Sequence, residues 1–290
     1  MRGIMDTTHI YNGPIGLETR HAGPIDGEVV ILLHGFPECW STWRHQIPAL
    51  AEAGYRVFIP NMRGYGQSSK PADVSDYHVD ELIKDVDAIR RYAGVEKVHL
   101  VGHDWGAMVA WWYALNKPEQ LASLSILNVP HPTVFLGTLR KSPMQMLKSW
   151  YVFYFQIPYL PELTLPVNKF FFFRDILKRT SNKGSYSDED FRELQKHWSI
   201  PGAMRAMVNY YRSAMRSQPK SPNGDRIKTP TQILWGEHDL ALTLDMARGS
   251  EKYLENGSLT TYPDATHWLA HDKPEEVSER LVTHFRSYPA

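Results

Sequence analysis

The sequence contains very little cysteine, since Cys39 is the only one in 290 residues. A single cysteine excludes an internal disulfide and fits a reducing compartment. No apolar run approaches the roughly eighteen residues that a membrane-spanning helix needs, and the first residues contain no apolar signal-peptide segment. We therefore expect a soluble, cytoplasmic protein without an integral membrane segment.

The sequence also lacks an excess of charge of either sign. Its 32 Lys and Arg residues are matched by 32 Asp and Glu residues, which gives a formal net charge of zero. This balance predicts no overall attraction to nucleic acid or to an anionic membrane, and it is compatible with a small neutral substrate. The histidines and carboxylates show no HExxH or comparable ligand spacing, so we expect no metal site.

Short apolar runs alternate with helical patterns along most of the chain. This alternation is typical of an α/β fold with a mostly parallel central sheet, whose strands are buried on both faces. The expected strands are residues 29–33, 56–59, 98–101, 124–127, 231–234 and 259–262, preceded by a hairpin of residues 7–11 and 16–21. The expected helices are residues 43–53, 79–92, 108–116 and 274–287.

The alternation stops between residues 132 and 230, a stretch rich in aromatic and basic residues. Ligands of open α/β sheets bind beyond the carboxyl ends of the strands, so a helical insert after the sixth strand can cover that edge as a lid. We therefore expect core residues 1–132, a helical cap of residues 133–229, and a second core part of residues 230–290. We expect the four phenylalanines at 170–173 to be buried in the cap, with a dimer or membrane contact as the alternative.

The stretch LVGHDWGA contains the pattern Gly-X-Asp-X-Gly directly after an apolar run. Its small residues Gly102, Gly106 and Ala107 suit a nucleophile elbow, where a strand turns sharply into a helix and the middle residue has a strained backbone. Asp104 in the middle favours displacement at a saturated carbon, because the ester it forms carries its carbonyl on the enzyme. The alternative is an ordinary strand-to-helix turn in which Asp104 caps the helix.

Three other loops follow predicted strands and carry polar groups. The HGFP loop offers the backbone N–H of Phe36, which can pair with that of Trp105 to form an oxyanion hole. Asp239, with Glu237 as the weaker choice, can orient a base, and His267 after the last strand can be that base. Nucleophile, acid and base appear in this chain order, each just after a strand, which favours a catalytic triad over a helix cap.

These motifs resemble the epoxide hydrolases of the α/β-hydrolase fold over essentially the whole chain. That family has an HGxP loop, an Arg-Gly-Tyr-Gly-X-Ser segment, a GHDWG elbow and an Asn-X-Pro segment before the cap; the matching residues here are 34–37, 63–68, 102–106 and 128–130. The chain departs from the pattern at Asn61, where Asp is common, and at Ala107, where Gly is common. The resemblance implies an α/β-hydrolase fold with an inserted cap.

The resemblance also implies two cap tyrosines that bind and protonate the epoxide oxygen. Tyr151 and Tyr211 stand at the matching positions, and Tyr154 and Tyr210 are their local alternatives. It further implies that the nucleophilic aspartate is alkylated by the epoxide and that His267 activates the water that releases a vicinal diol. No metal or organic cofactor is required. The implied partners are a small neutral epoxide and water, and a homodimer stays open.

Other functions stay open. A haloalkane dehalogenase also has Asp followed by Trp, but it needs halide-binding donors and the Phe36 side chain has none. A fluoroacetate dehalogenase needs cations where Trp105 and Met108 stand, and Asp104 disfavours a serine esterase. A non-catalytic ligand-binding protein is the alternative from another class. The side chains that we expect around the substrate are Pro37, Trp40, Phe135, Leu136, Tyr154, Phe155, Ile157, Leu240 and Trp268.

Overall fold

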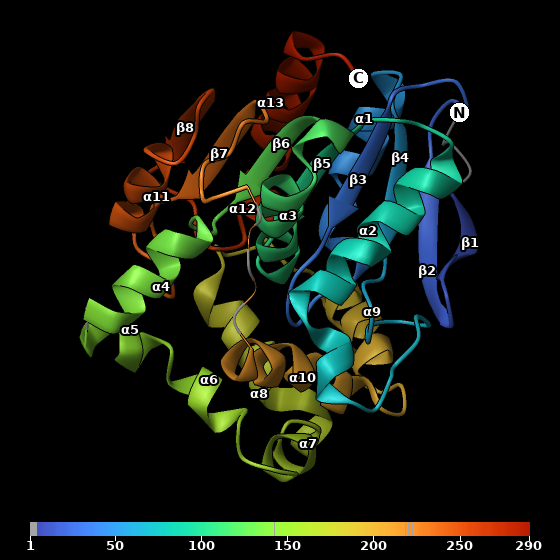
Figure 1. Cartoon of the computed structure of the whole chain (residues 1–290). Coiled ribbons are helices and arrows are strands. Elements are labelled where there is room, and N and C mark those ends of the chain that lie inside the picture. Colours follow the sequence, from blue (N-terminus) through green and yellow to red (C-terminus); the bar gives the residue numbers. More distant parts are fainter. Residues whose placement is uncertain (1–4, 142, 218, 220, 222) are drawn as a thin grey trace.

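The computed structural model describes residues 5–141, 143–217, 219, 221 and 223–290, and its strands form one sheet (Figure 1). The strands are β1 (Asp6–Asn12), β2 (Ile15–Ala22), β3 (Val29–Leu33), β4 (Arg56–Pro60), β5 (Val98–His103), β6 (Leu121–Leu127), β7 (Thr231–Gly236) and β8 (Gly257–Tyr262). They lie in the order β1-β2-β4-β3-β5-β6-β7-β8. The pairs β1/β2 and β2/β4 are antiparallel and the other pairs are parallel. The predicted mostly parallel sheet and its amino-terminal hairpin are confirmed.

The central strands are buried on both faces, which explains their unbroken apolar runs. All five residues of β3 are buried. Its Val30 and Leu32 side chains belong to one apolar cluster, and Ile31 and Leu33 belong to the other, because successive side chains of a strand point to opposite faces. The sheet therefore separates two hydrophobic layers, as a parallel sheet covered by helices requires.

Helices cover the two faces of the sheet (Figure 1). On one face, α2 (Val79–Ala93), α3 (Trp105–Asn116) and α11 (Leu244–Glu251) contribute buried side chains to the first cluster. On the other face, α1 (Gln46–Glu52), α12 (Leu269–Asp272) and α13 (Pro274–Ser287) contribute to the second cluster. The helix predicted at residues 43–53 is instead a short 3-10 helix, Trp40–Trp43, followed by α1. Pro48 lies in the first turn of α1, where its missing N–H costs no hydrogen bond.

The described residues between β6 and β7 contain helices and no strand, as predicted for the insert. We refer to these helices as the cap: α4 (Pro132–Lys141), α5 (Pro143–Lys148), α6 (Trp150–Tyr154), α7 (Leu160–Thr164), α8 (Val167–Thr180), α9 (Asp188–Trp198) and α10 (Ala203–Arg216). In Figure 1, α6 to α10 lie below the sheet, and α4 and α5 lie at its left. Nowhere in the described part of the chain is a helix both long and apolar enough to cross a membrane.

The run of four phenylalanines is only partly buried. Phe170 and Phe173 are buried, whereas Phe171 is 56% exposed. The run begins at a kink, since residues 168–170 have positive φ values, and then continues as a helix. Consecutive helical side chains point in different directions, so one helix face cannot bury all four. The expectation of a buried run is therefore wrong for Phe171.

Candidate active site

Asp104 lies at a strained turn between β5 and α3. Its φ and ψ are 49° and −121°, and its side chain makes no capping hydrogen bond to the helix. A Cβ at Gly102 would lie 2.5 Å from the carbonyl oxygen of Gly106, and a Cβ at Gly106 would lie 2.3 Å from that of Leu33. The geometry is thus that of a nucleophile elbow, and the alternative of a simple helix cap is wrong.

The loop after β3 holds the Asp104 carboxylate from the other side. The backbone N–H of Phe36 donates a hydrogen bond of 2.6 Å to Asp104 Oδ1. Burial lowers the pKa of His34 to about 4, and its neutral ring accepts a hydrogen bond from Met62 N through Nε2. His34 therefore anchors the loop. Trp105 is the first residue of α3, where backbone N–H groups have no partner within the helix, so its N–H is available beside that of Phe36.

His267 lies between two carboxylates. Its Nδ1–H donates to Asp239 Oδ2 at 2.7 Å, and its Nε2 is 3.7 Å from Asp104 Oδ2. Asp239 is held in turn by Asn128 Nδ2, 3.0 Å from its Oδ2, and by two backbone N–H groups at its Oδ1. Asp239, and not Glu237, therefore stands at the position that orients the histidine.

The pKa values of this cluster are shifted by burial and by charge. Burial alone lowers the pKa of His267, but the charge of Asp239 and the hydrogen bonds with both carboxylates outweigh it and raise the pKa to about 10. Burial raises the pKa of Asp104, yet the hydrogen bond and charge of His267 hold it below its usual value. The resting site therefore holds a charged imidazolium beside the ionised carboxylate of Asp104.

A second buried network lies beneath the site and was not predicted from the sequence. Glu38 Oε1 accepts hydrogen bonds from His271 Nε2 at 2.6 Å and from the Tyr186 hydroxyl at 3.0 Å. Its Oε2 is 3.6 Å from His103 Nδ1, and His103 Nε2–H donates to the carbonyl oxygen of His267 at 2.9 Å. The network therefore links His103, the residue before Asp104, to the backbone of His267.

Tyr151 and Tyr211 line the same cavity as Asp104 and His267. Burial raises the pKa of both hydroxyls, and the charge of Asp104 raises it further, so both stay protonated and can donate. The hydroxyl of Tyr210 instead donates to the carbonyl oxygen of Arg63 at 2.6 Å. These contacts favour Tyr211 over Tyr210 as a donor in the cavity.

The cavity has a volume of about 200 Å³ and lies between the sheet and the cap. Of the side chains expected around a substrate, Pro37, Phe155, Leu240 and Trp268 line it. The remaining lining residues are Phe36, Asp104, Trp150, Tyr151, Phe172, Phe173, Ile176, Thr180, Tyr211, Asp239, Ala241 and His267. Most of these side chains are apolar, and several from α6 and α8 had no signal in the sequence that singled them out.

Five of the side chains expected around the substrate lie elsewhere. Trp40 packs under the Arg20 guanidinium, and Phe135 and Leu136 on α4 line a separate cavity with Trp112. Tyr154 hydrogen-bonds to Thr164 Oγ1, and Ile157 is 45% exposed. These five residues do not line this cavity, because their positions depend on how the surrounding elements pack, which residue spacing does not determine.

Neither a metal site nor a reactive cysteine is present among the residues with described positions. They include no cluster of three or more His, Cys, Asp or Glu side chains that could hold a metal ion. Cys39 is buried, and burial raises the pKa of its thiol to about 12. A thiol with this pKa stays protonated and is a poor nucleophile at neutral pH. Asp104 is thus the nucleophile candidate that the cavity contains.

Comparison with known proteins agrees with this geometry. Residues 28–274 match the alpha/beta hydrolase fold family. The AB hydrolase superfamily protein YfhM of Bacillus subtilis is 36% identical over 274 residues, which cover 94% of this chain and 95% of that protein. Human epoxide hydrolase 4 is 36% identical over 268 residues, which cover 90% of this chain and 73% of that protein.

Solved structures give the same result. An epoxide hydrolase found in metagenomes from hot environments is 30% identical, has a TM-score of 0.84 and is matched over 99% of both chains. A mutant epoxide hydrolase from Bacillus megaterium is 28% identical, with a TM-score of 0.87, over 96% of this chain and 100% of that one. The chain therefore belongs to the α/β-hydrolase fold family, and within that family to the epoxide hydrolases.

Proposed function

We propose that this protein converts epoxides to vicinal diols through a covalent ester on Asp104. The observation that carries the proposal is the content of one cavity: a carboxylate at a nucleophile elbow, a histidine paired with a second carboxylate, and the two tyrosines Tyr151 and Tyr211. The names of the relatives, which are epoxide hydrolases, support the same substrate class. The apolar lining suits a neutral substrate.

The first step forms the ester. An oxygen of the Asp104 carboxylate attacks an epoxide carbon, and the bond between that carbon and the ring oxygen breaks. Tyr151 and Tyr211 hydrogen-bond to the ring oxygen, and one of them transfers its proton to the alkoxide. Because burial keeps both hydroxyls protonated, they are suited to act as acids and not as bases. The product is a hydroxyalkyl ester of Asp104 and one tyrosinate.

The second step hydrolyses the ester. His267 takes a proton from water while the hydroxide adds to Cγ of Asp104, and the backbone N–H groups of Phe36 and Trp105 stabilise the oxyanion. Collapse breaks the ester bond, and the departing diol oxygen takes the proton from His267. The carboxyl group of Asp104 then passes the remaining water proton to His267, which restores the resting imidazolium. The overall reaction converts one epoxide and one water into one diol.

Esterification of Asp104 lowers the pKa of His267, as the second step requires. In the resting site, the hydrogen bond and charge of Asp104 help to raise the pKa of His267. The ester is neutral, so both contributions are lost when Asp104 is alkylated, and the pKa of His267 falls. The histidine then gives up its proton, which goes to the tyrosinate left by the first step and restores the tyrosine, and the neutral ring becomes a base at neutral pH. Asp239 keeps its hydrogen bond to Nδ1 throughout and holds the ring in position.

A substrate panel tests the proposal. We expect the purified protein to form the diol from styrene oxide, and to release little halide from a chloroalkane and little nitrophenol from p-nitrophenyl acetate. Asp104→Asn is the matched control, and it removes the nucleophile while keeping the size of the side chain. Halide release that exceeds diol formation would indicate a dehalogenase. No turnover of any of the three would favour a ligand-binding protein.

A further inference from the structure

The cap exposes an unusual number of large apolar side chains. In the described part of the chain, fifteen large apolar side chains are exposed, and ten of them lie between residues 146 and 171. We call these ten the apolar face of the cap: Met146, Leu147, Trp150, Phe153, Ile157, Tyr159, Leu160, Leu163, Val167 and Phe171. Single exposed apolar residues are normal, whereas a concentration of them marks a binding surface.

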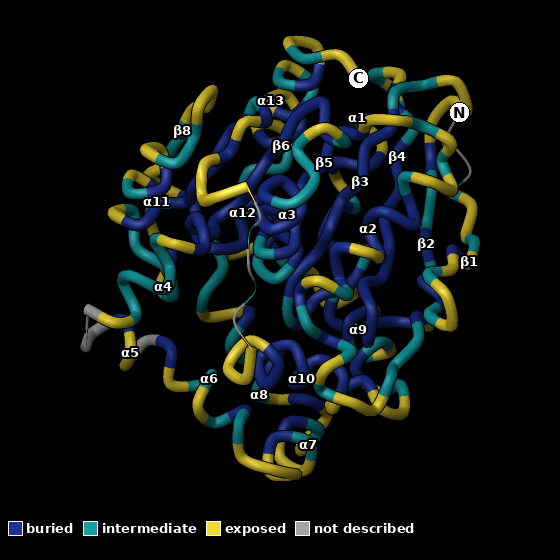
Figure 2. Tube along the Cα trace, in the orientation of Figure 1, coloured by how far each residue is buried: buried dark blue, intermediate teal, exposed yellow. Residues whose placement is uncertain are grey.

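Contacts between the cap helices hold the apolar face together. Tyr159, Leu163, Val167 and Phe171 follow one another at intervals of four residues, and Leu163 is 71% exposed. Leu163 lies in α7 and Phe171 in α8, and residues 168–170 have positive φ, so short separate segments and not one helix face turn these side chains toward solvent. Ring contact between Trp150 and Phe172 joins α6 to α8, and the Tyr154–Thr164 hydrogen bond joins α6 to α7. Figure 2 shows many exposed residues, in yellow, in this part of the cap.

The same segment carries a local positive charge that the balanced composition conceals. Residues 132–180 contain seven Lys and Arg residues and two Asp and Glu residues, a net charge of +5. Both acidic side chains are already paired with arginines, Glu162 with Arg212 and Asp175 with Arg179. Lys169 is exposed within the apolar face. The segment is therefore complementary to a negatively charged surface, and it would repel a second copy of itself.

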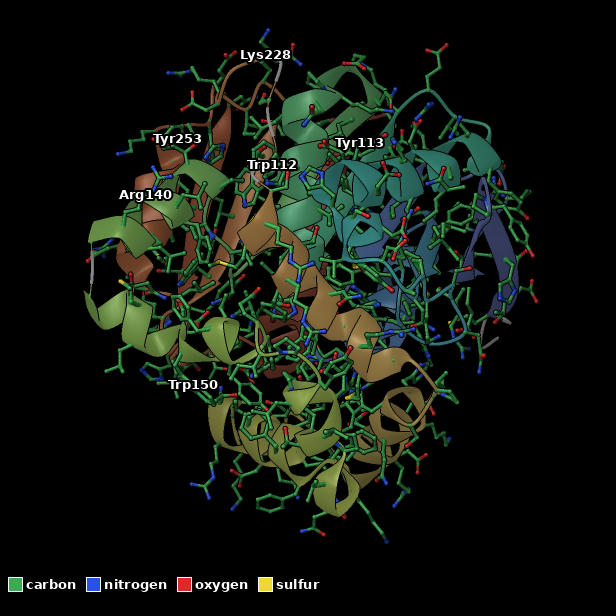
Figure 3. The ribbon with its side chains drawn as sticks, turned by 60° about the horizontal axis from the view of Figure 1, so that its bottom comes forward. Trp112, Tyr113, Arg140, Trp150, Lys228 and Tyr253 are labelled. Atoms are coloured by element: carbon green, nitrogen blue, oxygen red, sulfur yellow. The ribbon has the colours of Figure 1, made fainter. Side chains whose placement is uncertain are left out.

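The apolar face also reaches the mouth of the active-site cavity. Trp150 and Leu240 both line the cavity, and they are 50% and 61% exposed, so they mark its opening. Trp150 belongs to the apolar face as well, and Figure 3 labels it on the cap together with Arg140 of α4, which is exposed. A hydrophobic molecule that leaves a surface on which the apolar face rests can enter the cavity past Trp150 and Leu240, which carry no charge.

We propose that the apolar face of the cap docks on an anionic lipid surface, from which the enzyme takes epoxides dissolved in the lipid. Large apolar and aromatic side chains enter the boundary between headgroups and acyl chains, and the flanking basic residues attract the anionic headgroups. The docking surface stands on the exposed side chains and their charge. The choice of lipid-dissolved epoxides as substrates rests on the proposed function.

Sedimentation with vesicles tests the docking. We expect the protein to bind vesicles of phosphatidylcholine mixed with phosphatidylserine, and to bind phosphatidylcholine alone more weakly. Leu163→Asp combined with Val167→Asp should weaken binding at least about tenfold, because burial of one Leu side chain exceeds the 1.4 kcal/mol of a tenfold change. Lys169→Glu should weaken binding to the anionic vesicles roughly tenfold or more and leave binding to phosphatidylcholine nearly unchanged.

Matched controls separate docking from general effects of the substitutions. Ile25→Asp changes an exposed apolar side chain outside the cap, and Lys228→Glu reverses an exposed charge that Figure 3 labels on a loop away from Trp150. Neither control should change binding. Binding that does not exceed the background without vesicles, or that falls equally in the controls, would overturn the proposal. A dimer in light scattering that Leu163→Asp dissociates would also overturn it, because a second copy would then cover the face.

The activity of the same variants distinguishes this proposal from the proposed function. With styrene oxide in buffer, the combined Leu163→Asp and Val167→Asp variant should form diol at the parental rate, since neither residue lines the cavity. With a long-chain epoxide carried in anionic vesicles, its rate should fall about tenfold. If the parent protein forms no diol from either substrate, the proposed function is contradicted. The vesicle-binding measurement then still decides whether the cap docks on lipid.

Discussion

The backbone nitrogen of Phe36 lies 2.6 Å from Oδ1 of Asp104, although Phe36 follows strand β3 and Asp104 follows strand β5. This approach requires glycine at position 35, because a Cβ there would lie 2.2 Å from Cβ of Asp104 and 2.4 Å from its Oδ1. The proposed nucleophile Asp104 and the proposed oxyanion donor Phe36 therefore meet in one tightly packed contact. The proposed chemistry depends on that contact being preserved.

Gly35→Ala should disable the site without removing any reacting group. The added methyl group must displace the Asp104 side chain or the loop, and a misplacement of about 1 Å can reduce a rate by about 10². Alkylation rates from single-turnover experiments measure the loss. Gly137→Ala is the control, because a Cβ at Gly137 meets nothing within 4 Å and alanine favours the α4 helix. Equal rates for Gly35→Ala and the parent would show that the contact is not needed.

Tyr151→Phe and Tyr211→Phe should each slow ring opening. Assistance by a general acid is worth roughly 10²–10⁴ in rate, and the remaining hydroxyl can still donate in each single variant. The double variant should nearly abolish opening, with losses that do not add, because both hydroxyls serve one oxygen. Tyr154→Phe is the matched control, since its hydroxyl bonds to Thr164. A double variant that alkylates at the parental rate would remove both tyrosines from the mechanism.

His267→Gln should stop the reaction at the ester. Attack by Asp104 needs no base, whereas hydrolysis needs an activated water, so the intermediate should persist. Intact-protein mass spectrometry after addition of an epoxide should show one added substrate mass, and peptide mapping should place it on Asp104. An adduct on Cys39, or none, would contradict the two-step mechanism. An adduct on Cys39 is not expected because that thiol is buried.

Asp104→Asn should lower the pKa of His267. The parental value is about 10, above the ordinary 6.5, partly through the hydrogen bond and charge of Asp104. The Asn side chain is neutral, as the ester is, so the pKa of His267 in this variant approximates its pKa during the second step. Histidine NMR titration measures the change. Because its pKa is raised, the parental ring keeps its proton and stays charged through neutral pH. The variant ring should lose its proton at lower pH. An unchanged pKa would mean that Asp104 and His267 are not coupled.

The sheet and the catalytic loops could be predicted from the sequence for one physical reason. Strands buried on both faces leave unbroken apolar runs, and each proposed catalytic group follows such a run directly. Asp104, Asp239 and His267 therefore meet at one edge once the strands are placed in parallel. The strained elbow at Asp104 could be predicted as well, because a turn this sharp requires small residues on both sides of it.

The lining of the cavity could not be predicted in the same way. Phe135 and Phe155 are both aromatic residues of the insert, yet the first faces a separate cavity and the second lines the site. The difference arises from the angles at which α4 and α6 pack, and residue spacing does not fix these angles. The contact between Glu38 and His103 was missed because it joins the loop after β3 to the last residue of β5, and only the folded sheet brings these together. The charge of residues 132–180 was hidden by the balanced total for the whole chain.

The origin of the diol oxygen tests the central claim, the ester on Asp104, most directly. A single turnover with enzyme in excess is run in water enriched in oxygen-18, and both the diol and the peptide that contains Asp104 are analysed by mass spectrometry. The proposed mechanism predicts an unlabelled diol in the first turnover and labelled Asp104, because the new diol oxygen comes from the carboxylate and water repairs the carboxylate. A labelled diol with unlabelled Asp104 would show that water attacks the epoxide directly, and would contradict the account.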